Sequence, residues 1–211
     1  MSTNLRPPKF VYFDLGNVIV DFDREHAVRQ MAQVAGITPQ ATHAAVFESG
    51  LQAKLERGEI DWPTFHDAFS HSTGSTSAPA RLADAASDMF SLHVATLPVI
   101  AAVERAGYRT GILSNTCAPH WEHLLGKRYA VLPGRFSVIV LSHEVGALKP
   151  DGAIYEIAAQ MAGVPPEAIF FTDDVPEHVE AARAAGWDAE VFVSASRLAD
   201  DLQRRGLNLG L

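Results

Sequence analysis

The chain has 211 residues, of which 47% are hydrophobic and 20% charged, and its formal net charge at pH 7 is −8. This hydrophobic content predicts a globular protein with a substantial core, built as one large domain or as a core with a smaller module. The negative charge argues against nucleic acid or an anionic membrane as the main partner, because both bind clustered cations.

The N-terminal sequence MSTNLRPPKFVYFDLG lacks the apolar region of a signal peptide, and no apolar run is long enough to span a membrane. Cys117 is the single cysteine, so an internal disulfide is excluded. We therefore expect a cytoplasmic protein with no membrane partner. The composition fits a monomer and a homodimer equally.

Five short apolar segments predict β-strands, and each of them ends in polar residues. In chain order they are KFVYFD, YRTGILSN, FSVIVLS, AIFFTDD and AEVFVS. Stretches with helical spacing lie among them, and three of these carry an early proline or a late glycine: TLPVIAAVERAG, DGAIYEIAAQMAG and VPEHVEAARAAGW. The alternation predicts an α/β fold with a doubly wound, Rossmann-like parallel sheet.

A long segment after the first strand contains no convincing strand. Four stretches within it look helical, and Asp61 and Pro63 are suited to the N-cap and first turn of one of these helices. We predict that residues 1–20 and 96–211 form the α/β core. Residues 21–95 are predicted to form a small helical-bundle cap domain inserted after the first strand.

The polar residues that follow the predicted strands form one chemical inventory. In an open parallel sheet the ligand site lies beyond the C-terminal strand ends. The residues delivered there are Asp14, Ser114, Asn115, Lys149, Asp173 and Asp174. Carboxylates suit Mg²⁺ and can act as nucleophiles, while a lysine, a hydroxyl and an amide can neutralise a phosphoryl group. Taken singly, each residue would more often be a helix cap or a solvated side chain, but together they indicate phosphoryl transfer.

Four motifs in order, FDLGNVIVD, ILSNT, LKPD and FFTDDVPEHVEAARAAGW, resemble those of the haloacid dehalogenase superfamily. The resemblance covers nearly the whole chain, and the helical segment matches the position of the helical C1 cap of that superfamily. It is closest to the branch that holds bacterial α-D-glucose-1-phosphate phosphatase and the phosphatase domain of soluble epoxide hydrolase. The ERGEI stretch adds to the likeness to the former.

The resemblance implies a role for each residue of the inventory. Asp14 is implied to be the nucleophile, and Lys149 to hold Asp14 and the transferring phosphate together. Ser114 and Asn115 are implied to bind the phosphoryl group. The implied Mg²⁺ ligands are the carboxylates of Asp14 and Asp174 and the backbone carbonyl of Gly16, with Asp173 as a further ligand or as the group that orients a metal-bound water.

Gly16 departs from the pattern of the superfamily, because most of its phosphatases have an Asp there that protonates the leaving oxygen and later activates water. A leaving group that needs little protonation, such as an anomeric or acyl phosphate, is compatible with this loss. A second interpretation assigns the missing role to a cap or loop residue, with Glu48, His120 and His178 as candidates. General acid–base help is typically worth about 10²–10⁴-fold, so the loss matters where nothing replaces it.

Different chemistry is the third interpretation. Dehalogenases of the superfamily also lack this Asp but work without Mg²⁺, and phosphonate-cleaving members use a cap lysine, here Lys54. A degenerate member that binds a phosphorylated ligand or a protein is a rival from another class. We predict a Mg²⁺-dependent phosphatase that hydrolyses small phosphorylated metabolites, preferably sugar phosphates, through an aspartyl-phosphate.

Overall fold

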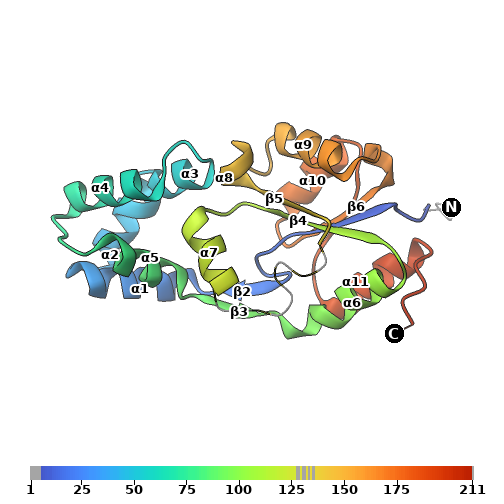
Figure 1. The fold of residues 1–211 in the computed structure, drawn as a ribbon, viewed down its shortest axis with the longest axis horizontal. Helices are drawn as coiled ribbons and strands as arrows, with labels where there is room; N and C mark the ends of the chain where they lie inside the picture. Colours follow the sequence, from blue (N-terminus) through green and yellow to red (C-terminus); the bar gives the residue numbers. More distant parts are fainter. Residues whose placement is uncertain (1–5, 127–128, 130–131, 133, 135, 211) are drawn as a thin grey trace.

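In a computed structural model of the protein, which describes residues 6–126, 129, 132, 134 and 136–210, five parallel strands form the central sheet. In chain order they are β1 (Phe10–Phe13), β4 (Arg109–Ser114), β5 (Val138–Leu141), β6 (Ile169–Asp173) and β7 (Asp188–Val191). Their spatial order is β5-β4-β1-β6-β7, so β1 occupies the centre (Figure 1). All five predicted strands are confirmed, and with them the parallel α/β fold.

The two faces of the sheet are both covered, which explains why its strands read as continuous apolar runs. Phe10 and Tyr12 pack on one face with the helices α9 (Gly152–Ala162) and α10 (Pro176–Ala184). Val11 and Phe13 pack on the other face with α6 (Leu97–Arg105) and α11 (Ala195–Arg204). Figure 1 shows the two helix pairs on opposite sides of the sheet.

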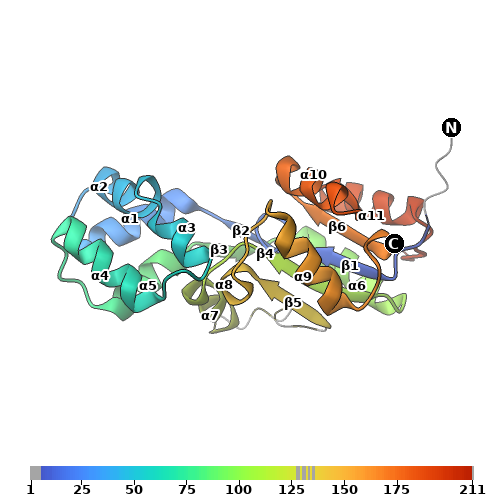
Figure 2. The same cartoon turned by 90° about the horizontal axis from the view of Figure 1, so that it is seen from above.

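The segment after β1 is mainly helical and projects from the sheet at the end away from the two chain termini (Figures 1 and 2). Its helices are α1 (Arg24–Ala35), α2 (Pro39–His43), a π-helix (Ala44–Glu48), α3 (Leu51–Glu56), α4 (Trp62–Thr73) and α5 (Pro79–Ser87). Asp61 caps α4 by accepting a hydrogen bond from the backbone N–H of Thr64, as predicted. A buried cluster that includes Phe65, Phe69 and Leu82 holds these helices together.

The prediction that this region holds no strand is wrong at its two ends. Val20–Phe22 (β2) and Phe90–Leu92 (β3) pair antiparallel, so the chain leaves the core and returns to it through a two-stranded ribbon. Each of these strands has three residues, too few for an alternation of apolar and polar side chains to be visible in the sequence. They are identified as strands by their pairing. The helical residues fall between these strands, and the assignment of 21–95 as a separate cap domain stays a prediction.

The remaining elements connect the strands. They are α7 (Ala118–Gly126), α8 (Ser142–Val145) and short 3₁₀ turns at Val94–Thr96 and Pro166–Ala168. The ends of the predicted core, residues 1–5 and 211, lie outside the described residues. Among the helices that are described, none has the length and apolarity needed to cross a membrane.

Candidate active site

The C-terminal ends of three neighbouring strands bring the predicted site residues together. Asp14 directly follows β1, Ser114 ends β4 and Asp173 ends β6. Because β1 pairs with both β4 and β6, these three positions lie side by side at one edge of the sheet. The backbone N–H of Asp14 donates to the carbonyl of Thr172 over 2.9 Å, which fixes the first strand end against β6.

Lys149 ties the strand ends together from the loop after α8. Its Nζ lies 2.7 Å from Oδ1 of Asp14 and 2.5 Å from Oδ2 of Asp173. Nζ also donates to the backbone carbonyl of Leu113 over 3.0 Å. All three charged side chains are buried, with exposed fractions of 1% for Lys149, 10% for Asp14 and 0% for Asp173. A buried charge cluster of this kind is stable only because each charge has a partner.

Asp173 has both carboxylate oxygens occupied by donors from the chain. Besides Lys149, it accepts from the backbone N–H of Val175 over 2.8 Å. Nδ1 of His178 lies 3.0 Å from Oδ1 of Asp173 and 3.1 Å from Oδ2. Asp174, by contrast, is half-buried, and its Oδ2 accepts one hydrogen bond from Asn17 over 2.8 Å.

The three acids form a group that could hold a cation. One carboxylate oxygen from each of Asp14, Asp173 and Asp174 lies within 4.8 Å of the others. Burial raises the pKa of Asp14 to about 7, although the ammonium of Lys149 opposes the shift. Burial also acts upward on the pKa of Asp173, but Lys149 and the hydrogen bond from His178 outweigh it, so that this pKa falls below its usual value. Added positive charge beside Asp14 would favour its ionised form.

Ser114 and Asn115 lie in the same pocket, but their side chains are held differently. The amide of Asn115 donates to the carbonyl of Lys149 and accepts from the backbone N–H of Lys149, both over 2.8 Å. Asn115 therefore anchors the loop that carries the lysine. The buried hydroxyl of Ser114 has one weak contact, 3.5 Å to the carbonyl of Asn115, which leaves it available for a ligand.

Gly16 has no room for a side chain without movement of a neighbour. A Cβ built there would meet the ring of Phe22 at 3.0 Å, with Oδ2 of Asp14 at 3.9 Å. The ring of Phe22, a residue of β2, thus occupies the space beside the nucleophile position into which a larger residue would point.

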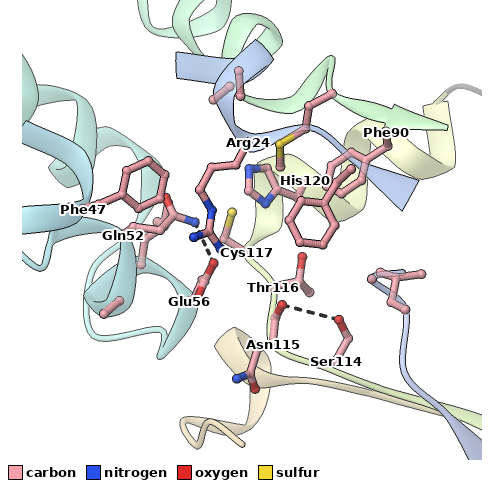
Figure 3. Close-up of a pocket in the computed structure, with 18 of the residues that line it drawn as sticks. Arg24, Phe47, Gln52, Glu56, Phe90, Ser114, Asn115, Thr116, Cys117 and His120 are labelled. Atoms are coloured by element: carbon pink, nitrogen blue, oxygen red, sulfur yellow. Dashed lines mark hydrogen bonds between the residues drawn. The ribbon is translucent and has the colours of Figure 1, made fainter. Parts of the chain in front are cut away.

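A cavity of about 380 Å³ extends from Asp14 and Asp174 toward the helical segment. Asp14, Gly16, Ser114, Asn115, Lys149, Asp174 and His178 line its inner end. Residues of the helical segment line most of the rest, together with Thr116, Cys117 and His120 from the chain after β4. Figure 3 shows Arg24, Phe47, Gln52 and Glu56 across the cavity from Ser114. Apolar side chains dominate this outer wall, and they include Val28, Met31, Val46, Phe47, Phe65 and Phe90.

The three candidate replacements for the missing acid differ in whether they line the cavity. His120 and His178 line the cavity, whereas Glu48 is exposed, lies 3.3 Å from Nδ1 of His43 and does not contribute to the lining. Burial lowers the pKa of His120 to about 4, helped by His123, so its imidazole is neutral at pH 7. Lys54, the candidate for phosphonate chemistry, is exposed and also lies outside the cavity lining.

The helical segment contacts the core beside the site. The positive φ of Gly58 (71°) lets its backbone approach the carbonyl of His143, which a Cβ at this position would meet at 2.3 Å. Arg57 donates to Asp151 over 2.8 Å, and buried Cys117 belongs to the apolar cluster of the helices. The cavity is therefore enclosed by both regions.

Several contacts of the site were not predicted. The partners Asn17 of Asp174 and Leu113 of Lys149 were missed, and His178 was named only as an acid–base candidate. An amide three residues before the end of FDLGNVIV is a weak signal, and a backbone carbonyl gives none. Arg24, Gln52 and Glu56 were also not predicted, because polar and charged residues on a helix are most often solvated.

A family model described as haloacid dehalogenase-like hydrolase matches residues 8–186. A D-ribitol-5-phosphate phosphatase of Bacteroides thetaiotaomicron is 24% identical over 189 residues, which cover 85% of this chain and 89% of that protein. Phosphatase MT3486 of Mycobacterium tuberculosis is 30% identical over 113 residues, 54% of this chain, and the match spans only 52% of that protein.

Solved structures share the fold. A haloacid dehalogenase family enzyme of Bacteroides thetaiotaomicron, crystallised with magnesium and inorganic phosphate, superposes with a TM-score of 0.79 at 22% identity. The alignment covers 89% of this chain and 95% of that one. An L-2-haloacid dehalogenase superposes with a TM-score of 0.67 at 18% identity, covering 95% of this chain and 100% of that one. The branch predicted from the sequence stays a prediction.

Proposed function

We propose that this chain, which belongs to the haloacid dehalogenase-like hydrolases, is a Mg²⁺-dependent phosphatase that hydrolyses small phosphate monoesters through an aspartyl-phosphate. The observation that carries the proposal is the cluster of Asp14, Asp173 and Asp174 around one point, with Lys149 bonded to two of them. Phosphatases among its relatives, including the ribitol-phosphate enzyme, support the reaction class.

The residues present fit a hard divalent cation. Oxygen ligands suit Mg²⁺, and among the described residues side-chain hydrogen bonds reach only one carboxylate oxygen of Asp14 and one of Asp174. We assign these two side chains and the backbone carbonyl of Gly16 as ligands. Asp173, whose oxygens are taken by three donors, orients Lys149 and acts on the metal at most through water. When bound, Mg²⁺ would offset negative charge on the phosphoryl oxygens.

The chain's own groups then perform two displacements. A carboxylate oxygen of Asp14 attacks phosphorus, the bond from phosphorus to the leaving oxygen breaks, and that oxygen departs with the electron pair. Water next attacks the aspartyl-phosphate, releases a proton and returns inorganic phosphate and free Asp14. Lys149 keeps Asp14 in place through its three N–H donors, and its charge offsets that of the equatorial oxygens, which the hydroxyl of Ser114 binds. The leaving oxygen takes its proton from solvent, because Gly16 supplies none.

The cavity residues also bear on the alternatives. Exposed Lys54 gives no support to Schiff-base cleavage of phosphonates. Dehalogenation without a metal does not call for the pair Asp173 and Asp174. The preference for sugar phosphates stays a prediction from the sequence, and the apolar side chains of the outer wall do not favour it.

The first experiment compares the wild type with Asp14→Asn on a panel of phosphate monoesters, with Mg²⁺ and with EDTA. We expect turnover by the wild type only with Mg²⁺, and a loss of about 10⁴-fold or more in the variant, because removal of a nucleophile abolishes the covalent route. Circular dichroism checks that the variant is folded. Full activity of Asp14→Asn, or activity that EDTA does not affect, would contradict the mechanism.

A further inference from the structure

Part of the polar surface on the outer wall of the active-site cavity is already taken by bonds within the protein. Gln52 donates its amide to Glu56 over 2.8 Å, and both ends of the Asn115 amide are taken by the backbone of Lys149. His120 is neutral at pH 7 and its ring bonds to the backbone of Ala86. The polar groups that these bonds leave on the lining are Arg24, which lies over the ring of Phe47, one oxygen of Glu56, the carbonyl oxygen of Gln52, the hydroxyl of Thr116 and one ring nitrogen of His120.

The rest of the outer wall is apolar and rich in rings. Phe47 and Phe90 stand on opposite sides of the opening in Figure 3, and Phe22 lies beside Gly16. A polyol in this space would lose water from several hydroxyls, and each hydroxyl that faces an apolar side chain and finds no partner costs free energy. A flat apolar ring loses little and gains contact with the aromatic wall. The volume of about 380 Å³ is within the roughly 300–1,000 Å³ of small-molecule sites.

The absence of an acid at Gly16 points in the same direction. A phenolate leaves without protonation far more readily than an alkoxide, since a phenol has a pKa of about 10. The pKa of an aliphatic alcohol is close to that of water, about 15.7. A site that cannot protonate the leaving oxygen therefore discriminates in favour of aryl esters over alkyl esters.

We infer that the substrates of this site are aryl phosphate monoesters, whose ring packs against the apolar outer wall. The inference rests on the proposed function. Asp14 displaces the phenolate as the bond from phosphorus to oxygen breaks, and water then releases phosphate, so that an aryl phosphate and water give a phenol and inorganic phosphate.

Three substrates separate the effect of leaving-group acidity from the effect of the apolar wall. Phenyl phosphate and benzyl phosphate have similar shapes but leaving groups of different acidity. Phenyl phosphate and α-D-glucose 1-phosphate both have acidic leaving groups but differ in polarity. We expect kcat/KM for phenyl phosphate to exceed that of each of the others at least about tenfold, the change that 1.4 kcal/mol of selective stabilisation produces. A higher value for glucose 1-phosphate, or an equal value for benzyl phosphate, overturns the inference.

A matched pair of variants tests the aromatic wall. Phe47→Ala should lower kcat/KM for phenyl phosphate about threefold to tenfold, the effect of losing one aromatic contact, and leave glucose 1-phosphate unaffected. Phe192→Ala removes a partly buried ring that packs in the core away from the cavity lining, and should change neither. An equal loss on both substrates in Phe47→Ala counts against the aryl site.

Calorimetric binding of phenyl phosphate and glucose 1-phosphate to Asp14→Asn distinguishes a failure of the proposed phosphatase function from a failure of the inferred ligand class. If the wild type turns over neither compound but the variant binds phenyl phosphate more tightly, the proposed function fails and the ligand class stands. Weaker or equal binding of phenyl phosphate overturns the ligand class whatever the activity.

Discussion

The two walls of the active-site cavity differ in polarity: one is charged and the other is mostly apolar. At the sheet edge, Asp14, Lys149 and Asp173 are charged, buried and bonded to one another. On the helical side, the lining is mostly apolar, and its polar members, Gln52 and Glu56 among them, bond to each other. The first wall concentrates charge where bonds would change, and the second excludes water from that charge.

The difference lies in how each wall is held. The sheet edge is anchored by backbone groups, since Lys149 donates to the carbonyl of Leu113 and Asp173 accepts from the N–H of Val175. Side-chain packing shapes the helical wall, and the rings of Trp62, Phe65 and Phe69 stack within it. Reactive groups attached to strand ends keep their geometry, whereas a packed apolar wall can be altered without disturbing them.

Removal of Lys149 should have the largest effect on stability. Lys149→Met leaves the carboxylates of Asp14 and Asp173 buried side by side, so we expect the free energy of unfolding to fall by about 3–5 kcal/mol in EDTA. Mg²⁺ should restore part of this loss, because a cation at the acids offsets the same charge. Urea unfolding in EDTA and in Mg²⁺ measures both. The exposed Lys54 serves as control, and Lys54→Met should change stability by less than about 0.5 kcal/mol.

An equal loss for Lys149→Met with and without Mg²⁺ would mean that no cation binds beside Asp14. Lys149 alone would then balance the charge of the two buried carboxylates.

Replacement of Gly16 tests a point where the ribbon of β2 and β3 reaches the charged wall, at the ring of Phe22. Gly16→Asp should destabilise the protein by about 1–3 kcal/mol, because the new Cβ crowds the ring of Phe22. The same variant should not gain activity on alkyl phosphates while Phe22 is present. A double-mutant cycle with Phe22→Ala measures the coupling of the two positions. The double variant should lose less stability than the sum of the losses in the two single variants. Strict additivity would show that Phe22 does not fill this space.

His120 stands at the boundary between the walls, where its ring lies edge-on to Phe90 with centroids 5.4 Å apart. Its pKa is about 4 in the folded protein and about 6.5 when unfolded, so the unfolded chain binds more protons between these values. Stability should therefore fall as the pH drops from about 6.5 to about 4, with a contribution of about 1–3 kcal/mol. Urea unfolding at several pH values should show a shallower fall in His120→Gln. His71→Gln, at an exposed position, should retain the slope of the wild type.

Much of the charged wall could be predicted from the sequence, because each of its residues ends or follows a local apolar run. Asp14 and Asp173 terminate buried segments, and a parallel sheet brings such ends together by its topology. The helical nature of the segment between β2 and β3 was equally visible in caps such as Asp61. These signals are local, so they can be recognised in the sequence without knowledge of the packing.

The contacts that depend on packing could not be predicted. Phe22 fills the space at Gly16 only because β2 pairs with β3, a strand that begins 68 residues later along the chain. His178 reaches Asp173 through the first turn of α10, a contact that a pattern of apolar residues does not encode. The enclosure of the cavity depends on the approach of Gly58 to His143, which brings together residues 85 positions apart.

The ion pair that bridges the two regions should have the smallest effect. Arg57 lies 2.8 Å from Asp151, but the two side chains are 39% and 50% exposed, so solvent screens the attraction. We expect Arg57→Gln to lower the free energy of unfolding by less than about 1 kcal/mol, and less still in high salt. Arg29→Gln, which removes exposed pairs within the helical segment, is the matched control. A loss of several kcal/mol in Arg57→Gln alone would show that charge, and not the packing around Cys117 and Gly58, holds the helical wall against the sheet edge.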